Sequence, residues 1–221
     1  MRPTEKLAVS AVCFDLDGTL LDTVPLIVAS HQFALADFPH LSTDTPYLIS
    51  TIGLPLEAVY NEKLLGSGAR NLMNRFIDHN IAHTQTHIAV FRGIVPMLEQ
   101  LRATGIPLGV VTAKRRDQAI MALDLFDMMP YFDVVLGRED SSRHKPDPEP
   151  LKEALRRLQI EDSRQLLYVG DSIYDLMAAN NLGSYSAAVA WSQTSREALL
   201  EQNPTLWLEQ AHDLPAKIRP V

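Results

Sequence analysis

Short unbroken runs of apolar residues recur along the chain, and each run ends at a turn or a polar residue. Such runs of four to six residues are typical of strands buried on both faces of a parallel sheet. Between them, apolar residues return every three or four positions, as in an amphipathic helix. The predicted strands span residues 11–14, 106–111, 131–136, 166–169 and 186–191, the last of which is expected to be the final strand. The predicted helices span residues 94–105, 116–126, 148–158, 173–182 and 194–201.

The stretch from residue 23 to residue 90 lacks this alternation. Its apolar positions, such as Leu72, Phe76 and Ile77, are spaced as on one face of a helix, and no alternating strand is evident. Prolines and glycines separate the apolar groups. Helices are therefore predicted over residues 25–38, 55–64 and 69–91.

These two patterns divide the chain into two predicted domains. Alternating strands and helices predict an α/β fold with a Rossmann-like parallel sheet, covered by helices on both faces. Residues 1–22 and 91–221 form this domain, and residues 23–90 form a helical domain inserted after the first strand. The linkers near residues 21–23 and 91–93 are the expected hinges.

Charge and cysteine content narrow the classes of function. The chain has 20 basic and 27 acidic residues, which gives a net charge of −7. An acidic protein lacks the broad basic surface that nucleic acid or an anionic membrane requires. The single cysteine, Cys13, lies inside the first apolar run and cannot form an internal disulfide. No segment resembles a signal peptide or a membrane span, so we expect a cytoplasmic protein.

Two carboxylates follow the first predicted strand at alternate positions. Asp15 and Asp17 come directly after the run at residues 11–14, and Gly18 then allows the backbone to turn. Like charges a few ångströms apart resist joint ionisation, so folding alone would favour neutral residues here. A cation or a chemical role is therefore expected for this pair. A turn with two solvated acids is the alternative.

Polar residues also follow other predicted strands. Thr112 comes after the strand at 106–111, Asp171 comes after the strand at 166–169, and Lys145 lies in a loop beyond a further strand. In parallel sheets, ligands bind beyond the carboxyl ends of the strands. The sequence thus predicts that an acid, a hydroxyl, an amine and a second acid meet at one edge of the sheet.

The residues around these positions resemble the four motifs of the haloacid dehalogenase superfamily. DLDGT matches the first motif, Thr112 the second, Lys145 in HKPDPEP the third, and GDSIYD the fourth. The resemblance implies the haloacid dehalogenase fold, with the helical insert as a cap domain that closes over the site and selects the substrate. It is closest to phosphoglycolate phosphatase-like enzymes. VVTAKRR, HKPDPEP and AVAWSQTSREALL also look like a pyrophosphatase of that group.

The same resemblance implies roles for the acids. Asp15 would attack phosphorus and form an aspartyl-phosphate, and Asp17 would protonate the leaving oxygen and later deprotonate water. The cofactor implied is Mg²⁺, bound by the carboxylates of Asp15 and Asp171 and by the backbone carbonyl of Asp17. Oxygen ligands of this kind suit a hard cation. Asp175, one helical turn after Asp171, is expected to support the site without binding the metal directly.

The remaining motif residues are expected to bind the substrate phosphate. Thr112 and Lys145 offer a hydroxyl and an ammonium group to the transferring phosphoryl group. Gly18, Ala113 and Lys114 lie beside them in the sequence and add further expected contacts. A cation at the start of a helix opposes the helix dipole, which favours a role for Lys114 in contacting phosphate.

The sequence does not decide the substrate or the type of reaction. We expect a phosphatase that acts on a small phosphorylated metabolite, such as phosphoglycolate. Inorganic pyrophosphate is an alternative substrate. A phosphomutase of the β-phosphoglucomutase type and a non-catalytic binding protein are the alternative functions. Either a monomer or a homodimer is compatible with the sequence.

Overall fold

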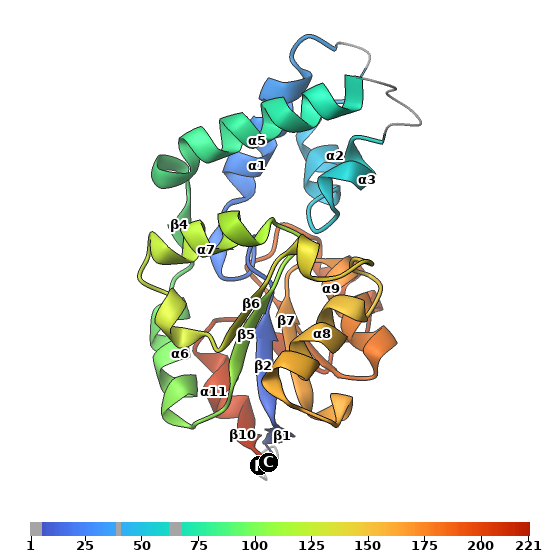
Figure 1. The fold of residues 1–221 in the computed structure, drawn as a ribbon. Helices are drawn as coiled ribbons and strands as arrows, with labels where there is room; N and C mark the ends of the chain where they lie inside the picture. Colours follow the sequence, from blue (N-terminus) through green and yellow to red (C-terminus); the bar gives the residue numbers. More distant parts are fainter. Residues whose placement is uncertain (1–5, 39–40, 62–67) are drawn as a thin grey trace.

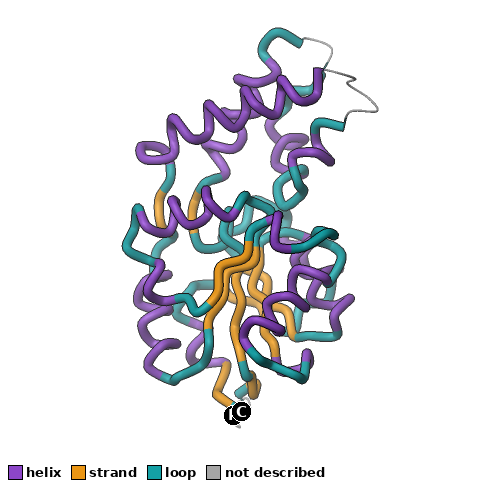
Figure 2. Tube along the Cα trace, viewed as in Figure 1, coloured by secondary structure: helices purple, strands orange, loops and turns teal. Residues whose placement is uncertain are grey.

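The computed structural model describes residues 6–38, 41–61 and 68–221. In these residues, helices surround a central sheet, and a further layer of helices lies beyond one edge of that sheet (Figure 1). Figure 2 shows the strands gathered in the middle of this core. An α/β fold with a Rossmann-like parallel sheet, the class predicted from the sequence, is thereby confirmed.

The central sheet is parallel throughout the described residues. Its strand order is β6-β5-β2-β7-β8-β9, so the first strand of the sheet in the sequence lies in the interior. Continuous apolar runs form these strands because both faces of the sheet are covered. The strands are β2 (Ala11–Phe14), β5 (Leu108–Val111), β6 (Val134–Leu136), β7 (Leu166–Gly170), β8 (Tyr185–Val189) and β9 (Leu206–Leu208).

Alternate residues of β2 enter two different cores. Val12 and Phe14 pack with α6 (Ile94–Ala103), α7 (Arg116–Asp124) and α11 (Asp213–Lys217). Ala11 and Cys13 pack on the opposite face with α8 (Glu149–Leu158) and α9 (Ile173–Leu182). Helix α10 (Arg196–Glu201) packs near the β8–β9 edge. The period of two in a strand explains this division. Strand β2 is therefore packed on both faces up to the point where Asp15 follows.

The additional helices form what we call the helical layer, which comprises the described residues from 24 to 87. Helices α1 and α5 pack along each other, and α2 and α3 lie beside them (Figure 1). Apolar side chains from all of these segments form a separate core between them. The helices are α1 (Val24–Leu35), α2 (Thr45–Ser50), α3 (Leu56–Val59) and α5 (Gly68–His87).

A two-stranded ribbon joins the helical layer to the sheet. Strand β3 (Leu21–Asp22) pairs antiparallel with β4 (Ala89–Val90), so both linkers run side by side. The two linkers lie at or next to the positions at which the sequence predicts hinges.

Several predicted boundaries are wrong. The chain continues after β8 into β9, and β10 (Ile218–Pro220) pairs parallel with β1 (Leu7–Val9) outside the central sheet. These strands have three residues each, too few to show a pattern. The helix predicted to reach residue 91 ends at His87, because residues 89–90 pair in the ribbon.

Other differences are local. The strand predicted from residue 131 begins as a 3-10 turn, Met129–Tyr131. Further 3-10 turns occupy Arg138–Asp140 and Ser163–Gln165. Helix α2 was missed, and the end of the helix predicted over 55–64 lies outside the described residues. No described helix is long and apolar enough to span a membrane.

Candidate active site

Three neighbouring strands bring the predicted polar residues to one edge of the sheet. β2 lies between β5 and β7, and all three are parallel. Asp15 follows β2, Thr112 follows β5, and Asp171 follows β7. Because parallel strands place their carboxyl ends together, these three side chains meet at one edge. The predicted convergence of separate pieces of the chain is therefore present in the structure.

Gly18 lets the turn after β2 approach Asp171 closely. Its backbone has φ +83°, and a Cβ at this position would lie 2.3 Å from Asp171 Oδ2. No side chain fits there without displacing the carboxylate. Thr19, the next residue, donates from Oγ1 to Asp171 Oδ1 at 3.1 Å. This turn thus positions Asp171 as well as Asp15 and Asp17.

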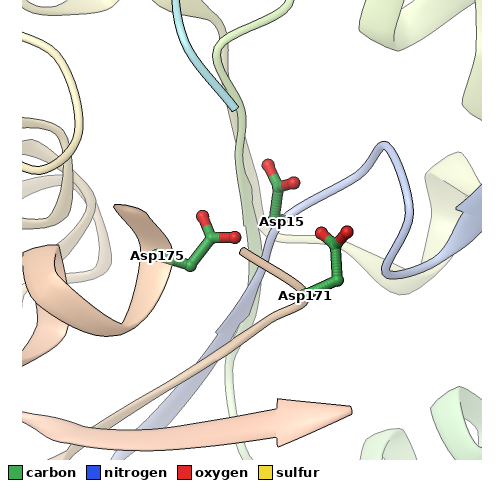
Figure 3. Close-up of side chains that lie close together, drawn as sticks. All are labelled: Asp15, Asp171 and Asp175. Atoms are coloured by element: carbon green, nitrogen blue, oxygen red, sulfur yellow. The ribbon is translucent and has the colours of Figure 1, made fainter. Parts of the chain in front are cut away.

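Three buried carboxylates face one another beyond the sheet (Figure 3). Asp15, Asp171 and Asp175 each offer one oxygen to a group of atoms that all lie within 4.8 Å of one another. Asp15 and Asp171 are 4% exposed, and Asp175 is fully buried. Three acids in this space repel one another strongly unless cations compensate them.

Lys145 is the cation that contacts this cluster. Its Nζ lies 2.9 Å from Asp15 Oδ1 and 2.6 Å from Asp175 Oδ1, and Lys145 itself is buried. Tyr168, in the middle of β7, accepts a third bond from Nζ at 3.1 Å. The Tyr168 hydroxyl donates in turn to the Val111 carbonyl at 2.7 Å. All three ammonium hydrogens therefore have acceptors, and the position of Lys145 is fixed.

Both oxygens of Asp175 already have partners. Oδ1 accepts from Lys145, and Oδ2 accepts from the backbone N–H of Ser172 at 3.0 Å and from its hydroxyl at 2.6 Å. Ser172 Oγ accepts in return from the Asp175 backbone, which completes a capping box at the start of α9. The cap of the helix therefore also orients the carboxylate that holds Lys145.

Burial and the excess of negative charge shift the pKa values of the charged groups in the cluster. Burial raises the pKa of Asp15 to about 7, with Lys145 opposing this shift and Asp175 adding to it. Burial, with Asp175 and Asp15, also raises the pKa of Asp171 well above its usual value. Burial would lower the pKa of Lys145, but Asp15 and Asp175 outweigh it and raise that pKa. Lys145 stays charged, and among the described residues it is the one cation that pairs with these carboxylates.

A divalent cation fits this set of groups. The acids supply oxygen ligands, and their charge exceeds that of Lys145 by two if all three are ionised. Mg²⁺ prefers oxygen ligands and is often held by one or two carboxylates together with substrate phosphate. Asp15 and Asp171 would be the natural ligands, because the oxygens of Asp175 are taken up by Lys145 and Ser172.

A cleft between the sheet and the helical layer reaches this cluster at Asp15. Asp15, Asp17, Thr112, Ala113 and Lys114 line its sheet side. Asp17 contacts Lys114, whose Nζ lies 3.2 and 3.3 Å from its two oxygens. Thr112 Oγ1 accepts from the Lys114 backbone N–H at 3.2 Å. Asp17 therefore stands at the wall of the cleft, beside the nucleophile candidate.

The structure thus brings together every predicted site residue. Asp15, Lys145, Asp171 and Asp175 form the buried cluster, and Gly18 packs against Asp171. The other predicted residues line the cleft: Asp17, Thr112, Ala113 and Lys114.

Sequence reasoning missed three residues that support the site. They are Thr19, Tyr168 and Ser172, which contact Asp171, Lys145 and Asp175 respectively. A hydroxyl inside the apolar run LLYVG was the available signal for Tyr168, because a buried tyrosine usually finds a partner. The serine three residues before Asp175 was the signal of a capping box.

Comparison with known proteins gives the family. A family profile described as haloacid dehalogenase-like hydrolase matches residues 12–189. The chain belongs to this family. The matched range includes all four motifs and every residue of the site. The sequence-based assignment to the superfamily and to a hydrolase is therefore confirmed.

Related proteins support the same placement. Pyrophosphatase PpaX of Bacillus velezensis is 33% identical over 209 residues, which cover 93% of this chain and 94% of the relative. A predicted phosphatase from Clostridium acetobutylicum has a similar structure, with a TM-score of 0.83, 26% identity, and coverage of 95% of this chain and 98% of that chain. A predicted phosphoglycolate phosphatase from Haemophilus somnus shares the fold, with a TM-score of 0.84, 22% identity, and coverage of 93% and 96%.

Proposed function

We propose that this hydrolase is a Mg²⁺-dependent phosphatase that cleaves a small phosphate ester or anhydride through an aspartyl-phosphate on Asp15. The observation that carries the proposal is the contact of Lys145 Nζ with Asp15 Oδ1 at 2.9 Å, inside a buried acidic cluster of which Asp15 lines the cleft. A carboxylate fixed by a cation in this way is oriented for attack. The alternative of a non-catalytic protein does not account for this arrangement.

In the first step, a carboxylate oxygen of Asp15 attacks phosphorus and the bond from phosphorus to the leaving oxygen breaks. Lys145 holds Asp15 in place and offsets the negative charge that accumulates. Thr112 and the backbone that follows it lie on the same cleft wall, where they can donate to phosphoryl oxygens. When bound between Asp15 and Asp171, Mg²⁺ would screen the repulsion between the carboxylate and the phosphate dianion.

Asp17 is proposed to move the protons. It gives a proton to the leaving oxygen as the first bond breaks. The resulting carboxylate then takes a proton from the water that attacks phosphorus in the second step, which releases phosphate and restores Asp15. Its contact with Lys114 keeps Asp17 on the cleft wall, within the same pocket as Asp15.

We also propose that residues 23–90 act as a cap domain over this site. The proposal is supported by the separate core of the helical layer and by its attachment through one ribbon. The cleft is lined by residues of both parts of the chain. The helical layer would then choose the substrate, while the sheet edge supplies the chemistry.

Phosphate release from a panel of substrates tests this function. Pyrophosphate, phosphoglycolate, sugar phosphates, alkyl phosphates and nucleotides would be assayed with Mg²⁺, with EDTA, and with Asp15→Asn. We expect release that requires both the metal and Asp15, with kcat lowered at least about 10³-fold in the variant. Release that is unchanged in Asp15→Asn would contradict the aspartyl-phosphate. Transfer of phosphate to a sugar hydroxyl, without release, would instead support a phosphomutase.

A further inference from the structure

The wall of the cleft that belongs to the helical layer is apolar. Among the described residues that line the cleft, none from this layer is Lys, Arg, Asp or Glu. We call this surface the apolar wall. It is formed by side chains from α1, from the loop before α3, from α3 and from α5, including Ile27, Ile52, Leu54, Leu56, Phe76 and Ile77.

The polar members of the same wall are uncharged at neutral pH. Thr51, Asn80 and His31 line the cleft beside the apolar side chains. His31 is 2% exposed, its Nδ1 lies 2.7 Å from the Tyr60 hydroxyl, and burial lowers the pKa of the ring to about 4. The helical layer therefore lines the cleft with polar groups that carry no positive charge.

The cations of the opposite wall each have an acid of their own. Lys114 contacts Asp17, Arg115 contacts Asp117 through two nitrogens, and Arg138 contacts Glu57. No Lys or Arg among the described lining residues is left without an acidic partner. When Asp17 carries the proton that it gives to the leaving oxygen, Lys114 is free to face the transferring phosphoryl group, as the sequence predicts. Arg115 and Arg138 remain paired with their acids. No other cation among the described lining residues is then left for a second anionic group on the substrate.

We propose that the natural substrate is a phosphate monoester of an uncharged alcohol that carries an apolar group, and that this group packs on the apolar wall. This inference rests on the proposed phosphatase activity. It departs from pyrophosphate and phosphoglycolate, the substrates that the names of similar proteins suggest. In both of those, the leaving group bears negative charge, which is costly to remove from water without a paired cation. An apolar leaving group gains free energy on the same surface.

An alkyl phosphate series tests the proposal directly. Methyl, butyl and hexyl phosphate have leaving alcohols of nearly equal acidity, so differences in kcat/KM report contacts of the chain with the cleft. With Mg²⁺, we expect kcat/KM to rise by roughly fourfold for each CH₂ group that is buried. Hexyl phosphate should exceed both phosphoglycolate and pyrophosphate. A kcat/KM that does not depend on chain length, or is highest for pyrophosphate, overturns the inference.

A charge placed on the apolar wall should reverse this preference. Leu54 is half-buried and lines the cleft without joining the core of the helical layer, so Leu54→Lys leaves that core intact. We expect the ratio of kcat/KM for phosphoglycolate to that for hexyl phosphate to rise about tenfold. Ile81→Lys is the matched control, because Ile81 is 44% exposed on α5 and does not line the cleft. An equal ratio in both variants, with unchanged thermal unfolding, contradicts contact with the wall.

The assays separate failure of this inference from failure of the proposed function. Metal-dependent release of phosphate that requires Asp15, but shows no preference for the alkyl chain, overturns the inference and leaves the phosphatase. No release from any substrate by the folded protein overturns both.

Discussion

The hydroxyl of Tyr168 lies between two parts of the site. It accepts from Lys145 and donates to the Val111 carbonyl, at the end of the strand that leads to Thr112. One side chain of β7 therefore fixes the cation and ties it to β5, on the other side of β2. Nothing in this arrangement requires that Tyr168 touch the substrate.

Tyr168→Phe should weaken catalysis and stability together. Loss of the hydroxyl leaves Lys145 with two acceptors and the buried Val111 carbonyl without its donor. We expect the unfolding free energy to fall by about 1–2 kcal/mol and kcat to fall roughly fivefold, with KM little changed. Denaturant unfolding and steady-state kinetics measure both. Tyr185→Phe, in the next strand, is the control, and an equal loss of kcat there would argue against a positioning role.

Gly18→Ala should disable the site through a single methyl group. The new Cβ would lie 2.3 Å from Asp171 Oδ2, in a backbone conformation that side chains rarely adopt. A displacement of about 1 Å at a catalytic group can cost roughly 10²-fold in rate, and we expect a loss of kcat of that order. Gly68→Ala is the matched control, because nothing lies within 4 Å of a Cβ there. Activity that survives in Gly18→Ala would show that Asp171 tolerates movement.

An ion pair connects the helical layer to the sheet domain, in addition to the β3–β4 ribbon. Arg138, in the 3-10 turn after β6, contacts Glu57 of α3 across the mouth of the cleft. Both side chains are partly exposed, at 32% and 49%. Pairs of this kind contribute little to folding stability, but this one joins the two walls around the substrate.

Glu57→Gln should therefore change substrate binding more than stability. We expect KM for an alkyl phosphate to rise two- to threefold, corresponding to about 0.5 kcal/mol, while the midpoint of thermal unfolding stays nearly constant. Asp37→Asn breaks an ion pair with Arg75 inside the helical layer and serves as the control. If the two variants raise KM equally, the pair across the cleft has no special role in binding.

The elements also show which features the sequence could reveal. The strand at residues 166–170 and the helix at 173–182 are each long enough to show their own hydrophobic pattern. Their observed bounds lie within one residue of the prediction. Strands β3 and β4 have two residues each and form only because the linkers meet. The site residues that follow strands were predictable from position. The hydroxyl of Tyr168 inside an apolar run indicated a buried hydrogen bond but not its partners, because these depend on which way β7 turns its side chains.

For the protein as a unit, stability should depend on pH through His31. The pKa of this buried ring is lowered to about 4, whereas a histidine in the unfolded chain titrates near 6.5. Between these values the unfolded state binds more protons, so stability falls as pH drops from about 6.5 toward 4. The loss from this one group approaches about 3 kcal/mol.

Urea unfolding of the native chain and of His31→Gln across this pH range measures that contribution. We expect the variant to be less stable at pH 7 but to show a shallower decline between pH 6.5 and 4.5. The difference between the two slopes isolates His31 from other titrating groups. Parallel curves would mean that the ring is accessible to protons in the folded state.

The β3–β4 ribbon has a mechanical consequence. Its two linkers are paired as antiparallel strands, so any rotation of the helical layer relative to the sheet would have to bend both linkers together. Leu21, at the start of the ribbon, accepts from the Gly18 backbone N–H at 2.8 Å and forms a bridge with Asp17. If the helical layer moves as the proposed cap, its rotation should therefore also shift the backbone of Asp17, the residue proposed to protonate the leaving group.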